Sequence, residues 1–103
     1  MSCIGFVTCK STDEARKIAQ ALLGKKLIAC ANIIPNVESM YWWNGKIETA
    51  TETLLLLKTN PEKTGAVISA IEADHSYELS AIEFINVDKT TPKTQQWINQ
   101  SIK

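Results

Sequence analysis

Hydrophobic residues recur along this chain with the two-residue period of β-strands in some segments and with the period of about 3.6 residues of α-helices in others. From Cys3 to Cys9 the residues are apolar or β-prone, as in a short buried strand. Ser11 and Glu14 then have capping-box spacing, and Gly24 marks the end of a helical pattern. The apolar side of this helix consists of Ala15, Ile18, Ala19, Leu22 and Leu23. The opening of the chain therefore predicts a strand followed by a helix.

A long hairpin is predicted next. Asn44-Gly45 separates two β-prone arms, which run from about Ile28 to Trp43 and from about Lys46 to Thr59. Asn-Gly tolerates positive φ at both central turn positions and so closes a two-residue hairpin. Pro35-Asn36 interrupts the first arm, and we expect a bulge or edge position there. Arms of this length extend beyond the body of a small domain. We therefore expect a neighbouring subunit to cover part of the hairpin.

The second half of the chain returns to helical and strand periods. Asn60-Pro61 predicts a helix start, with asparagine as the N-cap. A polar loop and a strand from Ile82 to Val87 follow, and Thr91-Pro92 predicts a last short helix. The order is β-α-β-β-α-β with an extra C-terminal helix. It predicts an α+β fold, the ferredoxin-like sandwich, with an antiparallel sheet.

The run of leucines from Leu54 to Leu57 indicates that both faces of the sheet are apolar, because neighbouring strand residues point to opposite faces. Right-handed crossovers place two helices on one face and leave the other open. An open apolar face is rarely left in water. We therefore expect several copies to close into a ring, although the sequence does not decide which leucines face the neighbours.

Composition narrows the function classes. The 103 residues predict a single domain over 1–103, with 11 basic and 11 acidic residues and no basic cluster. Neither nucleic acid nor an anionic membrane surface is indicated as a partner, and no apolar run reaches the roughly 18 residues that a membrane segment needs. Three cysteines (Cys3, Cys9 and Cys30) without a signal peptide predict reduced thiols and a cytoplasmic location.

Several segments together resemble the CutA family of divalent-cation tolerance proteins. They cover nearly the whole chain in order: Cys9 before a capped helix, Ala29-Cys30-Ala31-Asn32-Ile33-Ile34-Pro35, Tyr41-Trp42-Trp43-Asn44-Gly45-Lys46, Leu55-Leu56-Leu57-Lys58-Thr59 and His75-Ser76-Tyr77-Glu78. The resemblance implies a homotrimer of ferredoxin-like subunits, similar to the PII signalling proteins, and a link to copper and other divalent metals. The family usually reads His-Pro-Tyr-Glu-x-Pro-Glu before the last strand, whereas Ser76, Ser80 and Ala81 stand here, which predicts a less preorganised loop.

A metal site is predicted at the end of the first strand. An antiparallel last strand beside the first brings Cys9 near His75, and a thiol with an imidazole suits copper or zinc. Asp74 or Glu78 would supply a further ligand. The resemblance points the same way, because the positions matching Cys9 and His75 are associated with copper in bacterial relatives. The alternative is that Cys9 is a buried hydrophobe and His75 a solvated loop residue.

The second candidate site is a cleft between subunits for a small anionic or metal-chelate ligand. Counting outward from the turn places Lys58 near Cys30 on the opposing arm. In a ring of subunits, the hairpin of one subunit would bring its Cys30–Lys58 end over the opposite end of the neighbour's sheet, where the aromatic residues lie. The cleft would then contain Lys58, Tyr41, Trp43, Tyr77 and Glu78. Alternatively, Trp42 and Trp43 fill the core between subunits.

No enzyme is predicted, because the chain has neither a nucleophile motif nor a phosphate loop and contains one histidine. We expect a trimeric protein of metal tolerance or homeostasis that binds a metal ion or a small ligand, with no organic cofactor. The alternatives are a PII-like sensor or scaffold for a non-metal ligand and, for an animal protein, a factor that supports acetylcholinesterase anchoring.

Overall fold

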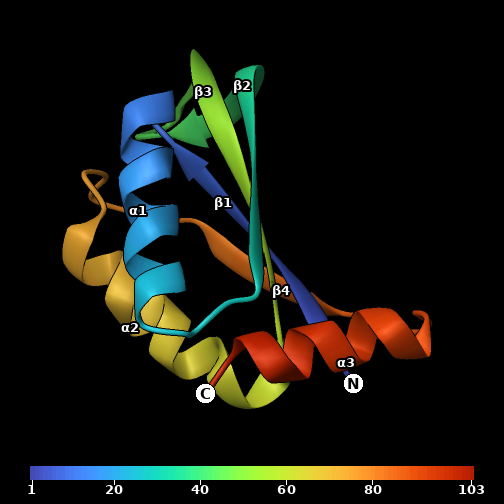
Figure 1. The fold of residues 1–103 in the computed structure, drawn as a ribbon. Coiled ribbons are helices and arrows are strands. Elements are labelled where there is room, and N and C mark those ends of the chain that lie inside the picture. The colour runs from blue at the N-terminus through green and yellow to red at the C-terminus, as the bar shows by residue number, and fades with distance from the viewer.

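A four-stranded antiparallel sheet forms the centre of the computed structural model, which describes residues 1–103 (Figure 1). Its strands are β1 (Cys3–Cys9), β2 (Cys30–Trp43), β3 (Lys46–Thr59) and β4 (Ile82–Asn86), in the spatial order β2-β3-β1-β4. The predicted pairing of the first and last strands is confirmed: Val7 lies opposite Ile82, and Cys3 lies opposite Asn86. The fold is the predicted α+β arrangement with one long hairpin and an added C-terminal helix.

Helices α1 (Thr12–Gly24) and α2 (Thr64–Asp74) lie on one side of the sheet, and α3 (Pro92–Ser101) crosses its lower end (Figure 1). As predicted, Ser11 caps α1: its Oγ accepts a hydrogen bond from the Glu14 N–H at 3.1 Å. None of the helices is long and apolar enough to cross a bilayer.

Asn60 lies at the predicted N-cap position before Pro61, but its side chain does not cap the turn that follows. A short 3₁₀ turn, η1 (Pro61–Lys63), precedes α2, and the Asn60 side chain makes no capping hydrogen bond. Its amide instead donates to Asn99 Oδ1 at 2.8 Å, and its Oδ1 accepts from Gln95 at 3.0 Å. The asparagine side chain therefore ties α3 to the start of η1 instead of closing the helix that follows it.

The hydrophobic core lies between the sheet and the helices. Leu55 and Leu57 are fully buried there with Val7, whereas Leu54 and Leu56 are half-buried on the opposite face. On that open face Phe6 lies opposite Leu56, and Ile4 lies opposite Ile85. Strand alternation thus decides which leucines the helices cover, and the other two lie on a sheet face that no helix of this chain shields.

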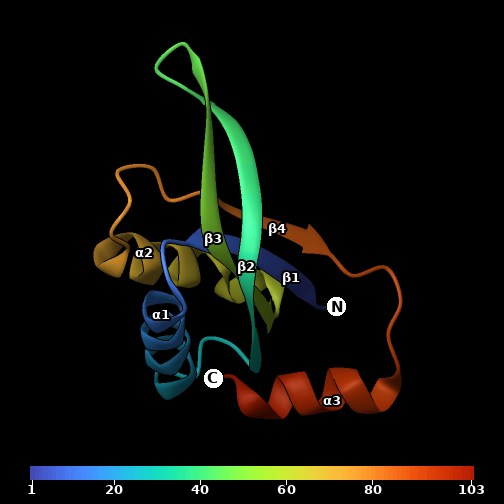
Figure 2. The same cartoon turned by 90° about the horizontal axis from the view of Figure 1, so that it is seen from above.

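The β2–β3 hairpin projects far beyond the rest of the molecule (Figure 2). Asn44 and Gly45 close it with φ angles of 51° and 77°, the positive values that an Asn-Gly turn requires. The predicted bulge is present: the register shifts between Ile34 and Val37, and Asn36 has a φ of 62°. Near the tip, Trp42 is 72% exposed. Hydrophobic side chains on the hairpin therefore lie outside any core of this chain.

Gly5 in β1 faces a ring of β4 at close range, which gives a test of this packing. A Cβ added at Gly5 would lie 2.6 Å from Phe84 Cε1, whereas one added at Gly65, in α2, meets open space. We expect Gly5→Ala to lower the free energy of unfolding by about 1–3 kcal/mol through overpacking. Gly65→Ala should raise it by up to about 1 kcal/mol through helix propensity. Denaturant unfolding at one fixed protein concentration measures both, and equal stabilities of the two variants would contradict the described β1–β4 packing.

Candidate metal centre and neighbouring groove

The loop of residues 75–81 is fixed to the end of β1 by its first residue. His75 follows α2, and its Nε2 lies 2.8 Å from the Thr8 carbonyl oxygen. The Tyr77 N–H donates to His75 Nδ1 at 3.0 Å. Since Nδ1 accepts a hydrogen bond, it carries no proton, and Nε2–H is the donor to Thr8. Backbone groups on both sides therefore fix the orientation of the imidazole ring.

Three potential metal ligands meet at this point. Cys9 Sγ, a Glu14 carboxylate oxygen and a His75 ring nitrogen all lie within 4.8 Å of one another. They come from the last residue of β1, the first turn of α1 and the residue after α2. Ligand atoms of a tetrahedral zinc ion lie about 3.3–3.8 Å apart, given bond lengths of about 2.0–2.3 Å. A contraction of about 1 Å would bring the three groups to coordination distance of one ion.

The Cys9 thiol is protonated at neutral pH. Burial raises its pKa, and the negative charges of Glu14 and Glu52 raise it further, to about 12. A buried thiol of this kind is a poor nucleophile. A metal ion at this position would therefore have to displace the thiol proton.

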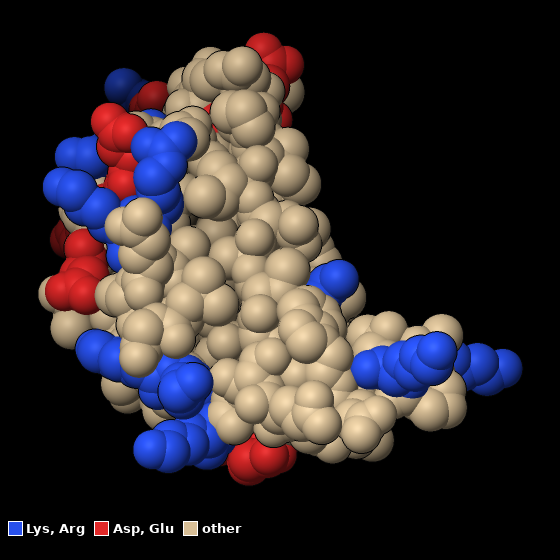
Figure 3. Space-filling view, viewed as in Figure 1, with Lys and Arg blue, Asp and Glu red and all other residues tan.

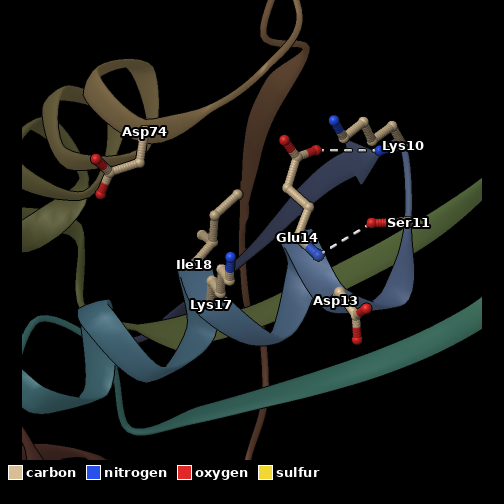
Figure 4. Close-up of a pocket in the computed structure, with 7 residues that line it drawn as sticks. All are labelled: Lys10, Ser11, Asp13, Glu14, Lys17, Ile18 and Asp74. Atoms are coloured by element: carbon tan, nitrogen blue, oxygen red, sulfur yellow. Dashed lines mark hydrogen bonds between the residues drawn. The ribbon is translucent and has the colours of Figure 1, made fainter.

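Glu14 is ionised more easily than a free glutamate. Burial raises its pKa, but hydrogen bonds from Ser76 and Lys10 and the nearby His75 outweigh this effect, and the net pKa is lowered. The Lys10 N–H donates to Oε1 at 3.1 Å, and the Ser76 N–H donates to Oε2 at 3.0 Å. Figure 4 shows the Glu14 carboxylate beside the Lys10 amide at the start of α1. The carboxylate therefore connects the loop after α2 to the beginning of α1.

Asp74, the third metal ligand predicted from the sequence, is not a member of the group that contains Cys9 and His75. Its carboxylate lies on α2, apart from Glu14, on the far side of a pocket of about 490 Å³ (Figure 4). Lys10 and Lys17 line this pocket together with the carboxylates. In the structure Glu14, and not Asp74, lies beside Cys9 and His75.

A larger groove of about 750 Å³ lies on the other side of the loop, between the hairpin and residues 77–81. Tyr41, Trp43, Tyr77 and Glu78, four of the five residues predicted for a ligand cleft, line it. The Tyr77 hydroxyl donates to Glu52 Oε2 at 2.7 Å. Burial, followed by the hydrogen bond to Glu52 and its charge, raises the pKa of Tyr77. This hydrogen bond holds the loop against β3.

Lys58, the fifth predicted cleft residue, does not line this groove. It lies opposite Cys30, as counting from the turn predicted, at the far end of β3 from the groove. Within one chain the groove therefore lacks the basic residue that the sequence analysis placed in it.

Comparison with known proteins agrees with the fold and with the order of the motifs. Residues 3–101 match the family model described as CutA1 divalent ion tolerance protein. The chain belongs to the CutA1 family. The divalent-cation tolerance protein CutA of Archaeoglobus fulgidus is 40% identical over 98 residues, which is 95% of each chain. A solved structure of the periplasmic divalent cation tolerance protein CutA from Archaeoglobus fulgidus superposes with a TM-score of 0.97 at 39% identity and covers all of both chains.

Relatives from animals and plants are longer. The human protein CutA is 36% identical over 95 residues, which is 92% of this chain and 53% of the human protein. The solved structure of CutA1 from Oryza sativa superposes with a TM-score of 0.96 at 30% identity, over 99% of this chain and 94% of that one. The chain thus spans about half the length of the human relative, and the shared part is the fold described above.

Two residues of these sites were missed by sequence reasoning. The sequence analysis explained Glu14 only as a capping-box residue and therefore did not consider it as a neighbour of Cys9. Glu52 precedes the leucine run and carries no motif, but its register opposite Val37 places it on the open sheet face. Counting strand register from Asn44-Gly45 would have found Glu52. Glu14 could have been found from its place one helical turn after the end of β1.

A proline in place of Ser76 would remove the N–H that donates to Glu14, because proline has no backbone N–H. Because the pKa of Glu14 is lowered from 4.5, its ionisation stabilises the fold above pH 4.5, and this stabilisation is lost as the pH falls through the folded-state pKa. The free energy of unfolding should therefore decrease less for Ser76→Pro than for the wild type when the pH is lowered from about 6 to about 3.

Ser76→Ala is the matched control, because it keeps the backbone N–H and loses only the side-chain hydrogen bond that also lowers the pKa of Glu14; its pH profile should lie between those of the wild type and the proline variant. The effect of proline on the unfolded chain does not depend on pH and drops out of the comparison. Denaturant unfolding across the pH range measures the effect. Identical pH profiles for the proline and alanine variants would show that the Ser76 amide does not stabilise the ionised carboxylate.

Proposed function

We propose that the chain is a single-domain binding protein, not an enzyme, that takes up a divalent metal ion in the cytoplasm and serves metal tolerance. The observation that carries the proposal is the group of Cys9, Glu14 and His75, whose ligand atoms lie within 4.8 Å of one another. The family to which the chain belongs is described by divalent ion tolerance. A direct role of this group in binding the ion is the simplest link between the two.

The donor set fits a borderline metal ion. One sulfur, one carboxylate oxygen and one imidazole nitrogen suit Zn²⁺ or Cu²⁺, and a given site of this type binds Cu²⁺ more tightly. Metal-bound histidines usually have their second ring N–H fixed by a carbonyl or a carboxylate. The Thr8 carbonyl already holds the His75 ring in this way. A metal ion that takes the Nδ1 lone pair would replace the Tyr77 N–H as its partner.

The working form that we propose is a homotrimer. The sheet face opposite the helices carries Phe6, Leu54 and Leu56, and no helix of the chain covers it. Hydrophobic residues on the projecting hairpin are exposed as well, with Met40 at 70% and Ile47 at 61%. Exposed apolar surfaces of this kind are typical of interfaces between subunits. Copies that bury the open faces against one another in a closed ring would cover both regions.

The second candidate function is a PII-like sensor whose ligand is not a metal. It is favoured by the groove of about 750 Å³, which is lined by Tyr41, Trp43, Tyr77 and Glu78 and lies beside the metal-ligand group. His75 and Tyr77 belong to one loop and their rings lie 4.8 Å apart, so the two sites share a wall. A small ligand in the groove would therefore contact the same loop that carries a metal ligand.

The metal proposal predicts one tightly bound ion per chain. Titration calorimetry of the reduced protein with Zn²⁺, which does not oxidise thiols, should show this stoichiometry, and Cys9→Ala with His75→Ala should abolish the binding heat. Glu14→Gln should weaken binding by at least about tenfold, because a neutral amide is a poor ligand. Affinity should increase with pH, since binding releases the Cys9 proton.

Asp74→Asn is the matched control for Glu14→Gln, because it removes a nearby carboxylate that lies outside the ligand group. It should leave the stoichiometry and the affinity unchanged. If the variant without Cys9 and His75 still binds the ion, the proposed site is refuted. If Asp74→Asn alone loses binding, Asp74 is a ligand and the assignment of Glu14 is wrong.

The assembly proposal predicts a change in molar mass when a charge enters the open sheet face. The wild type should have three times the chain mass in light scattering, and its unfolding should depend on protein concentration. Leu56→Asp should give single chains or aggregate, since three buried aspartates would have to meet apolar surface. Gln20→Asp, at an exposed position of α1 on the opposite side of the sheet, is the control and should stay trimeric. A wild type that behaves as a single chain at micromolar concentration would disprove the trimer.

A further inference from the structure

Both ring nitrogens of His75 lie within hydrogen-bond distance of backbone groups. Nε2 is 2.8 Å from the Thr8 carbonyl oxygen, and Nδ1 accepts the Tyr77 N–H at 3.0 Å. A carbonyl oxygen can only accept a hydrogen bond, so it suits a protonated Nε2, and Nδ1 is the nitrogen whose lone pair a metal ion can take. The Tyr77 N–H and a metal ion therefore compete for the same atom of His75.

The other two members of the metal-ligand group are not in this conflict. A carboxylate oxygen has about two lone pairs, so each Glu14 oxygen can bind an ion and still accept its hydrogen bond from the Lys10 or the Ser76 N–H. Cys9 has to lose its own thiol proton. Among the three ligands, only binding at His75 therefore requires a hydrogen bond within the protein to break.

The side chain of Tyr77 restrains the N–H that has to leave. Its hydroxyl donates to Glu52 Oε2 at 2.7 Å, and Glu52 lies on β3 with only 7% of its surface exposed. The Tyr77 ring also lies 4.8 Å from the His75 ring, at an angle of 59° between the two planes. All these contacts are made within one chain. Tyr77 is thus attached to the sheet by its hydroxyl and to His75 by its amide.

We propose that Tyr77 is a latch on the metal site: its N–H has to leave Nδ1 of His75 before an ion binds there, and its hydroxyl bond to Glu52 opposes that departure. The inference rests on the metal-binding function proposed above and adds how the affinity of that site is set. The coupling is reciprocal by thermodynamic linkage. Any change that loosens Tyr77 raises the affinity for the ion, and a bound ion loosens Tyr77 by the same factor.

Removal of the hydroxyl gives the first test. Tyr77→Phe keeps the ring and the backbone N–H but loses the bond to Glu52, so its affinity for Zn²⁺ should be about threefold to tenfold higher than that of the wild type. Tyr41→Phe is the matched control, since Tyr41 is the other tyrosine of the chain and lies on β2, and it should bind as the wild type does. Titration calorimetry measures both affinities, and circular dichroism shows whether each variant is folded.

Zinc that binds elsewhere on the surface has to be subtracted in these titrations. Acidic and basic side chains lie mixed on the side of the molecule that α1 occupies (Figure 3), and exposed carboxylates there can bind Zn²⁺ weakly. The variant that combines Cys9→Ala with His75→Ala gives this background, because it lacks two members of the ligand group.

Hydrogen exchange of the wild type gives a second test that needs no variant. NMR of the intact assembly follows the amides of Tyr77 and Ser76 with and without saturating Zn²⁺. We expect the Tyr77 amide to exchange at least about tenfold faster with zinc, because it loses its acceptor. The Ser76 amide should keep its exchange rate, since the Glu14 carboxylate can bind an ion and still accept this hydrogen bond.

The outcomes separate the latch from the metal site itself. If zinc binds while the Tyr77 amide stays protected, or if Tyr77→Phe binds no more tightly than Tyr41→Phe, the latch is wrong and the metal site stands. Equal acceleration of the Ser76 and Tyr77 amides would show a general loosening of the loop and would also overturn the role of Tyr77. If the wild type binds no zinc above the background, the metal site is refuted and the latch with it.

Discussion

The hydrogen bond between His75 and the Thr8 carbonyl is the contact on which the functional part of this molecule depends. It fastens the loop that follows α2 to the end of β1, across 67 positions of the chain. On one side of the fastened loop, His75 faces Cys9 and Glu14. On the other, Tyr77 reaches Glu52 and forms a wall of the aromatic groove. The Ser76 N–H on Glu14 and the Tyr77 hydroxyl on Glu52 fix the same short segment further along, so three hydrogen bonds together set the geometry of both sites.

A second constraint is the unequal covering of the sheet. Helices α1 and α2 cover one face, where Leu55 and Leu57 are completely buried, whereas neither helix covers the other face, where Leu54 and Leu56 are half-buried. A hydrophobic sheet with one bare face is a costly state in water, at about 25 cal/mol per Å² of apolar surface. The groove borders this sheet face and the projecting hairpin, the surfaces through which copies would meet. Assembly would therefore affect ligand binding in the groove.

The sequence was sufficient for the order of the elements because each strand and helix carries its own period and boundary residues. The opposition of Cys30 and Lys58 could also be counted, since Asn44-Gly45 fixes the register of the hairpin. The role of Asn60 could not be read in this way, because its partners lie on α3 and only tertiary packing brings them close. Glu14 was missed for a related reason. Its role in the capping box can be recognised from the neighbouring residues alone. His75 and Ser76 lie 61 and 62 positions further along the chain, and only the folded structure brings them next to Glu14.

The bulge in β2 determines which chemistry the groove presents. Pro35 and Asn36 together lie opposite Thr53, so β2 has one residue more than β3 at this point. Every side chain beyond it therefore changes to the other face of the sheet. Tyr41 turns toward the groove side for this reason, and with regular pairing Met40 would take its position. A single inserted or deleted residue at this point would change the residues that β2 contributes to the aromatic wall, whereas Cys9, Glu14 and His75 lie on other elements.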